Sequence, residues 1–170
     1  MRALPVILAV ALAASNANAQ TIASALRNAA GDTIGKVILT EAPRGVLVRI
    51  EVKGLAPGWH GLHFHEKADC SKADFTTAGG HAHGGGDRIH GLLSPKANET
   101  GDLPNLYVND QGVGMTEVFT GLTNLRDLRS GDGSAVIIHA NADDHLTQPI
   151  GGAGPRVACA EMTEGRDHPL

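Results

Sequence analysis

Three histidines in strand-like sequence are the first residues whose types and spacing could do chemistry. The segment HGLHFH ends in His63 and His65, and residues two apart in a strand point to the same face, so both imidazoles can reach one ion. His139 closes the apolar run SAVIIH, which brings one polar side chain to the edge of the core. A single His-x-His is a weak signal, because two surface histidines give the same pattern. Nitrogen ligands suit copper or zinc rather than calcium or magnesium.

A glycine-rich stretch supplies further ligand types. GGHAHGGGDRIHGLLSPKANETGD contains His81, His83 and His90, and it ends with Glu99 and, three residues later, Asp102. Imidazole nitrogens and carboxylate oxygens are both acceptable zinc ligands. The stretch therefore predicts part of a metal site whose other ligands come from elsewhere in the chain.

The elements that position these residues are predicted to be strands. Apolar and polar residues alternate in short runs separated by Gly, Pro, Asn and Asp, and no helical period is convincing after the N-terminal segment. Eight strands are expected, at 21–27, 36–41, 45–54, 59–65, 105–109, 115–119, 134–140 and 154–160. An all-β antiparallel sandwich or Greek-key barrel follows from this pattern.

The sequence also predicts one hairpin and three long connections between the strands. The runs 36–41 and 45–54 are expected to form a hairpin, because turn residues separate them. The connections 66–104, 120–133 and 141–153 are longer than hairpin loops, and long loops inside a compact domain are usually functional or disordered.

The N-terminal segment MRALPVILAVALAASNANAQ has the pattern of a secretory signal peptide. Arg2 precedes a short apolar run, and we expect cleavage after Ala19. The run is shorter than the roughly 20 apolar residues that span a membrane. A periplasmic or secreted protein is therefore expected, and in such a compartment the only two cysteines, Cys70 and Cys159, favour a disulfide over two free thiols.

Length and charge exclude several classes. With 170 residues, one domain over 20–170 is expected, and a dispersed formal charge of -4 offers no basic patch for nucleic acid and no polybasic helix for a membrane surface. The sequence leaves open whether the protein is a monomer or a homodimer.

Five motifs, HGLHFHE, AGGH, GDLPN, VIIHANADD and GPRVAC, occur in an order and at separations that resemble the secreted bacterial copper,zinc superoxide dismutases. The resemblance covers essentially the whole mature chain. It implies an eight-stranded Greek-key barrel with a long metal-binding loop and a long electrostatic loop. It also implies two ligand sets, which are His63, His65, His81 and His139 for copper, and His81, His90 and Asp102 for zinc, with His81 shared.

The chain departs from the family at the remaining zinc ligand. Where the family has a histidine three residues before the aspartate, this chain has Glu99. A carboxylate can close a tetrahedral zinc shell, so Glu99 as a ligand is one interpretation. The others are a solvent-facing Glu99 with zinc held by three residues and water, and a site that is poorly occupied or completed by His83.

Three further residues match family positions. Asp143 matches an aspartate that accepts hydrogen bonds from one copper-ligand and one zinc-ligand histidine, although a loop aspartate capping its own backbone is the alternative. His60 matches a structural histidine expected to hydrogen-bond a backbone carbonyl. Arg156 matches the arginine beside copper, with a surface charge on a terminal strand as the alternative.

The resemblance implies a superoxide dismutase that converts two superoxide anions and two protons to oxygen and hydrogen peroxide. Copper must be the redox metal, since it cycles between Cu(II) and Cu(I) whereas zinc does not change oxidation state. The resemblance gives His81 the role of proton donor and Arg156 that of guiding the anion. The alternative function is a periplasmic copper-binding module with little turnover.

Overall fold

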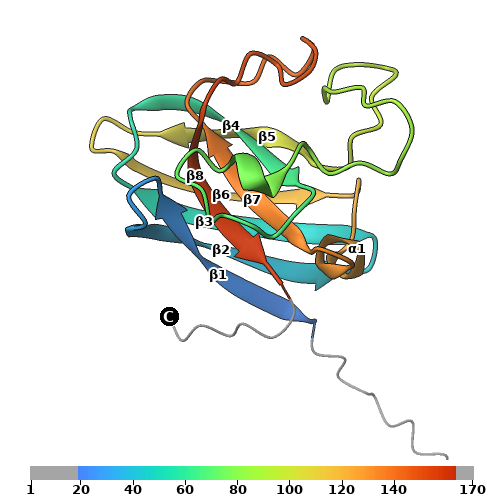
Figure 1. Cartoon of the computed structure of the whole chain (residues 1–170), viewed down its shortest axis with the longest axis horizontal. Coiled ribbons are helices and arrows are strands. Elements are labelled where there is room, and N and C mark those ends of the chain that lie inside the picture. Colours follow the sequence, from blue (N-terminus) through green and yellow to red (C-terminus); the bar gives the residue numbers. More distant parts are fainter. Residues whose placement is uncertain (1–18, 164–170) are drawn as a thin grey trace, which may run out of the picture.

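Eight antiparallel strands close into a barrel in the computed structural model, which describes residues 19–163 (Figure 1). The strands are β1 (Thr21–Asn28), β2 (Thr33–Ala42), β3 (Gly45–Lys53), β4 (Gly58–His65), β5 (Asp102–Val108), β6 (Val113–Thr120), β7 (Ser134–His139) and β8 (Arg156–Met162). Around the barrel they follow the order β1-β2-β3-β6-β5-β4-β7-β8, and β8 pairs with β1. The predicted all-β barrel and its eight strands are confirmed. The expected signal peptide falls almost entirely outside the described residues.

Alternating burial explains why these segments form strands. In β3 the side chains of Val48 and Ile50 are fully buried, whereas Arg49 between them is exposed. The predicted hairpin between β2 and β3 is present, with Ala42 paired to Gly45 across a two-residue turn. Gly45 has a φ of 155°, and a Cβ there would lie 2.0 Å from the carbonyl oxygen of Thr120, so only glycine fits.

The same alternation puts the β4 histidines on the outside of the barrel. Leu62 and Phe64 belong to the core, so His63 and His65 point outward. They are nevertheless buried, because long connections cover this face. Phe75 from the connection 66–101 packs with outward residues of β7 and with Cys159 of β8. The predicted disulfide, Cys70 to Cys159, fastens the connection to β8.

The structure shifts the predicted starts of several strands and adds two short helices. β2 begins at Thr33 rather than at residue 36, and β6 and β8 begin two residues before and after their predicted starts. β5 begins at Asp102 rather than at residue 105, and Asp102 pairs with His63. A register shift in this pairing accommodates Pro104, whose missing N–H made the segment look like loop. The helices α1 (Leu125–Arg129) and η1 (Thr76–Ala78) are too short to show a helical period in sequence.

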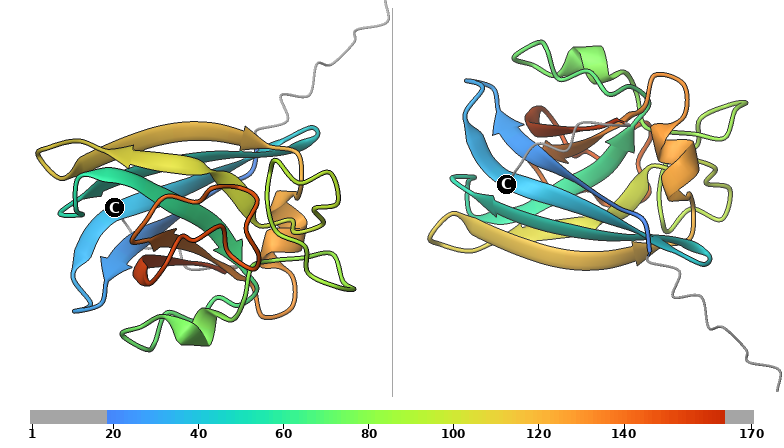
Figure 2. Two further views of the ribbon diagram at one scale, coloured as in Figure 1. Left: turned by 90° about the horizontal axis from the view of Figure 1, so that it is seen from above. Right: turned by 90° about the horizontal axis from the view of Figure 1, so that it is seen from below.

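Two long connections meet on the covered face. The connection 66–101, green to yellow-green, and the connection 140–155, orange to red, lie beside one another in the views of Figures 1 and 2. The Leu93 N–H donates a hydrogen bond to the carbonyl of His145, which joins the two directly. Among the described residues, no helix is both long enough and apolar enough to span a membrane.

Candidate metal centre

Four histidine side chains converge on the covered outer face. His63 and His65 come from β4, His139 ends β7, and His81 is joined to His65 by an isolated β-bridge. All four are buried, and one ring nitrogen of each lies within 4.8 Å of the others. We call this set the four-histidine cluster.

One nitrogen of each ring in this cluster has no hydrogen-bond partner within the described part of the chain. These atoms are His63 Nδ1, His65 Nε2, His81 Nε2 and His139 Nε2. Leaving a buried polar atom unpaired costs about 1–3 kcal/mol, so four such atoms close together are expected where a cation binds. Four imidazole nitrogens suit copper or zinc, and the donor set therefore fits copper.

Hydrogen bonds fix the opposite nitrogens of two of these rings. His65 Nδ1 lies 3.0 Å from the carbonyl oxygen of Gly79, and His139 Nδ1 lies 2.9 Å from that of Gly154. Because a carbonyl only accepts, Nδ1 carries the proton in both rings, and Nε2 keeps the lone pair that a metal needs.

Burial keeps these imidazoles neutral. It lowers the pKa of His63 to about 4, although the hydrogen bond with Asp143 opposes the shift. Burial, together with the neighbouring His63, lowers the pKa of His139 to about 3. The pKa of His65 is lowered as well, first by burial and then by the charge of Arg156. At neutral pH none of these three rings has to lose a cationic proton before it binds a metal.

A second cluster places carboxylates against two imidazoles. His90 Nδ1 lies 2.9 Å from Asp102 Oδ1 and 3.1 Å from Glu99 Oε2. His81 Nδ1 lies 2.7 Å from the same Glu99 oxygen and 3.5 Å from the same Asp102 oxygen. We call these four residues the carboxylate cluster. Its oxygen and nitrogen donors fit a zinc site.

His63 also has a ligand atom within 4.8 Å of atoms of His81, His90 and Asp102. Its Nε2, however, is bonded to Asp143, and its Nδ1 is one of the four unpaired nitrogens. Glu99 Oε2, by contrast, faces both His81 and His90.

Opposite charges set the pKa values in the carboxylate cluster. Burial alone would lower the pKa of His90, but hydrogen bonds with Asp102, Asp143 and Glu99 outweigh it and raise the pKa to about 11. The pKa of Asp102 lies well below its usual range, because hydrogen bonds with His81 and His90 overcome the opposing effect of burial. Without a metal, a protonated His90 thus neutralises part of the negative charge.

Asp143 joins the two clusters. Its Oδ2 lies 2.7 Å from His63 Nε2, and its Oδ1 lies 3.1 Å from His90 Nε2. A Cβ on Gly151, which has a φ of 60°, would fall 1.6 Å from Asp143 Oδ1, so only glycine leaves room for this carboxylate. The arrangement orients one ring of each cluster.

A family model described as copper/zinc superoxide dismutase matches residues 33–162 of the chain. The chain belongs to this family.

Relatives of known name agree with this assignment. A superoxide dismutase [Cu-Zn] of Caulobacter vibrioides is 52% identical over 135 residues, which cover 76% of this chain and 78% of that protein. Superoxide dismutase [Cu-Zn] 2 of Aquifex aeolicus is 37% identical, covering 79% of this chain and 81% of that protein. The crystal structure of a SOD-like protein from Bacillus subtilis matches with a TM-score of 0.76 and 32% identity, covering 82% of this chain and 97% of that chain.

Within this copper/zinc superoxide dismutase chain, the structure places Glu99 and His83 differently. Glu99 is 5% exposed and lies against His81 and His90, as the distances above show. His83 lies outside the carboxylate cluster, where its Nδ1 accepts a hydrogen bond from the Gly85 N–H and its Nε2 lies 3.6 Å from Glu66. Glu99, unlike His83, therefore lies against both imidazoles of the carboxylate cluster.

Arg156 and His60 both contact residues that frame the four-histidine cluster. Arg156 pairs with His139 in the β7–β8 register and donates hydrogen bonds to the carbonyls of Phe75 and Gly79. The ring nitrogens of His60 lie 2.6 Å and 2.8 Å from the carbonyl oxygens of His139 and Ala56.

Sequence reasoning missed two amides and one carboxylate near the clusters. Asn105 hydrogen-bonds the backbone of Asp143, and Gln148 hydrogen-bonds the backbone of His90. The Glu66 carboxylate accepts from the Gly80 N–H and from Arg88. Asn105 lies within the GDLPN motif, so a signal existed there, whereas nothing in the sequence marks Gln148.

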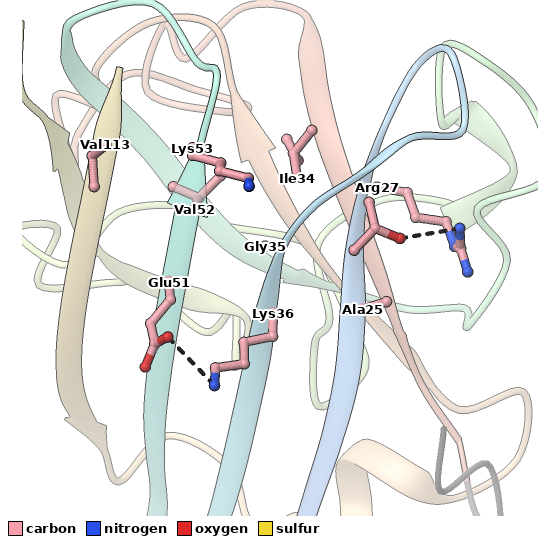
Figure 3. Close-up of a pocket in the computed structure, with 10 residues that line it drawn as sticks. Ala25, Arg27, Ile34, Gly35, Lys36, Glu51, Val52, Lys53 and Val113 are labelled. Atoms are coloured by element: carbon pink, nitrogen blue, oxygen red, sulfur yellow. Dashed lines mark hydrogen bonds and ion pairs between the residues drawn. The ribbon is translucent and has the colours of Figure 1, made fainter. Parts of the chain in front are cut away.

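A hollow of about 680 Å³ lies away from both clusters, on strands β1, β2 and β3 (Figure 3). Lys36 and Glu51 form an ion pair at one side of it. It shares no residue with either cluster, so it is not the site of the family's chemistry.

Proposed function

We propose that this chain carries out superoxide dismutation at the four-histidine cluster, with copper held by His63, His65, His81 and His139. The observation that supports this most directly is the set of four unpaired, buried ring nitrogens. Copper supplies, when bound, the one-electron redox change that turns two superoxide anions and two protons into oxygen and hydrogen peroxide. Zinc completes the cofactor set of the family.

His81 is proposed to hold and release a proton at Nε2. Its Nδ1 faces Glu99 and Asp102 in the carboxylate cluster, while its Nε2 faces the other three histidines. A proton on His81 Nε2 therefore lies at the four-histidine cluster, where the reduced oxygen product would need it. The carboxylates keep the orientation of the ring fixed during this exchange.

Arg156 is proposed to guide the superoxide anion. The chain is net negative, with a formal charge of -4, so attraction for an anion must be local. Arg156 is only half-buried and is paired in register with His139. Its hydrogen bonds to two carbonyls hold the guanidinium there without neutralising its charge.

Zinc is proposed to bind His81, His90, Asp102 and Glu99. If Glu99 ligates less firmly than the histidine of the family pattern, Glu99→His should slow zinc release to a chelator. Equal release rates in the two proteins would show that Glu99 already binds zinc well. Cobalt substitution gives a second readout, because the visible spectrum of tetrahedral Co(II) changes when an oxygen donor becomes nitrogen.

Metal analysis and a superoxide-consumption assay on the purified mature protein test the function as a whole. Copper and zinc near one each with fast turnover supports the enzyme. Copper alone with negligible turnover would support the copper-binding module instead. Arg156 counts against that alternative, since metal storage needs no guide for an anion.

The chain is proposed to be exported, cleaved after Ala19, and folded as one domain over 20–170. The disulfide between Cys70 and Cys159 supports an oxidising compartment. N-terminal sequencing of the protein from the periplasmic fraction should begin at Gln20. An intact Met1 would contradict the cleavage.

A homodimer is proposed through the outer face of β4, β5 and β6. Trp59 and Tyr107 pair across β4 and β5 with ring centroids 5.0 Å apart, and Met115 and Phe119 on β6 are 70% and 55% exposed. Exposed apolar side chains in a contiguous patch often mark an interface. A two-fold axis brings one patch against a copy of itself, so the patch must be self-complementary. Exposed Arg49 and Glu117 lie opposite each other in the β3–β6 register and give this face both signs of charge.

Light scattering after size exclusion tests the dimer. Met115→Glu should shift the mature protein from dimer to monomer, whereas Leu93→Glu, which alters an exposed leucine in the connection 66–101, should not. A monomeric wild type at all concentrations would overturn this part of the proposal.

A further inference from the structure

Two side-chain amides outside both metal clusters each hydrogen-bond the N–H and the C=O of a single residue. Asn105 Oδ1 accepts from the Asp143 N–H at 2.9 Å, and its Nδ2 donates to the Asp143 carbonyl at 2.8 Å. Gln148 Oε1 accepts from the His90 N–H at 2.9 Å, and its Nε2 donates to the His90 carbonyl at 2.8 Å. In each case the side-chain amide satisfies the backbone N–H and C=O of one residue, as the backbone of a paired strand would.

The two residues held in this way are bonded to each other through their side chains. His90 Nε2 lies 3.1 Å from Asp143 Oδ1. Gln148 and Asp143 both belong to the connection 140–155, which contains no strand or helix. The connection is therefore fastened to β5 through Asn105 and to His90 through Gln148.

The partners of the two amides differ in a way that predicts separate effects. Asp143 bonds one ring from each cluster, His63 and His90, so Asn105 acts on both clusters. Within residues 19–163, Gln148 hydrogen-bonds the backbone of His90 and the carbonyl of Leu146, so its direct contact is with the carboxylate cluster.

We infer that Asn105 and Gln148 are positioning residues that control metal retention, Asn105 for both metals and Gln148 for zinc only. Neither touches a metal donor atom, and each acts through the residue whose backbone it holds. The inference rests on the proposed zinc ligation by His90 and on the bridging contacts of Asp143.

Zinc release to a chromophoric chelator from the metal-loaded mature protein tests the role of Gln148. Gln148→Met keeps the length of the side chain and removes its hydrogen bonds, and the position is solvent-exposed, so the fold should persist. We expect zinc release to accelerate about tenfold, as the loss of up to three modest hydrogen bonds implies, with copper release unchanged. Gln111→Met, at an exposed amide in the β5–β6 turn, is the matched control and should change neither rate.

The same assay on Asn105→Asp tests the other amide. An aspartate can still accept from the Asp143 N–H but turns a carboxylate oxygen toward the Asp143 carbonyl, so both copper and zinc should leave faster. Acceleration of zinc release alone would overturn the shared role of Asn105.

Hydrogen exchange of the His90 and Asp143 backbone amides, measured in the metal-free protein, tests the two amide contacts without any influence of a bound metal. Gln148→Met should expose the His90 amide to exchange and leave the Asp143 amide protected, and Asn105→Asp should do less to His90 than to Asp143. An unchanged His90 amide together with wild-type zinc release in Gln148→Met would overturn the role of Gln148. A wild type that takes up no zinc would overturn the ligand assignment instead, and the exchange pattern would still decide whether the amides hold the connection.

Discussion

The two metal clusters share His81 and lie side by side, yet they are built on opposite principles. The four-histidine cluster takes three of its four rings from strands, and burial keeps those three neutral. The carboxylate cluster takes His90 and Glu99 from a loop and is held together without a metal by a protonated imidazole between carboxylates. The barrel itself therefore preorganises one site, whereas the other depends on loops and charge balance.

Removing one histidine from each cluster should separate their functions most clearly. His139→Ala should remove copper and reduce superoxide turnover to background, because it removes one of the four unpaired ring nitrogens of the cluster. His90→Ala should remove zinc and leave most of the copper. Elemental analysis and turnover measure both, and His83→Ala should retain both metals. Equal loss of both metals in both variants would mean that the clusters do not bind independently.

Asp143→Asn tests the link between the clusters. The amide keeps the shape but cannot accept hydrogen bonds from both His63 and His90, and loss of such a supporting contact typically weakens metal binding about 10- to 100-fold. Competition with a chelator should show weaker binding of copper and zinc alike. An effect confined to one metal would break the proposed bridge.

The metal-free protein should lose stability at acid pH, because its buried imidazoles are neutral in the folded state. In the unfolded chain His63 and His139 titrate near pH 6.5, while in the folded protein their pKa values are about 4 and about 3. Between these values the unfolded state binds more protons, so the free energy of unfolding should fall as pH drops from about 6.5 toward 4, by about 2–3 kcal/mol for each of the two rings. Urea unfolding after removal of metals measures this decline.

The contribution of His90 to the free energy of unfolding depends on pH in the opposite direction. Its folded pKa of about 11 lies above the unfolded value, so its contribution is complete below pH 6.5 and is lost as the pH rises toward 11. His139→Asn should remove the share of the acid decline that comes from His139 and leave the alkaline decline unchanged. A decline of the same size in this variant would show that other groups cause it.

A milder change should come from altering the approach of the anion rather than the clusters themselves. Arg156→Ala should slow turnover about tenfold at low ionic strength and flatten its salt dependence, since steering by a local charge is screened by salt. Copper content should stay near normal. Stopped-flow rates equal to those of the wild type at low salt would remove Arg156 from the substrate path.

The strands of this fold could be predicted from sequence because their signal is local. Alternation in β3 and β4 places Val48 inside and His63 outside without knowledge of any partner. The start of β5 was missed because Pro104 resembles a loop residue and is tolerated only through an irregularity in pairing. The position of Glu99 depends on how a long loop folds back over β4, and no local pattern encodes this.

The supporting contacts were the least predictable part of the site. Asn105 and Gln148 act through backbone groups of residues 38 and 58 positions away in sequence. Their side chains have no special chemistry, so composition and spacing cannot single them out. Only the folded arrangement shows what they hold.

The residues of the four-histidine cluster are far apart in the sequence, so they are synthesised at different times. The β4 histidines are made early, but His139 and Arg156 follow only as β7 and β8 emerge, and the barrel closes when β8 pairs with β1. A partly synthesised chain that ends before β7 therefore lacks both His139 of the four-histidine cluster and the disulfide partner Cys159. The four-histidine cluster can form only after β7 has been made, and a premature stop anywhere before β7 leaves a product that cannot assemble it.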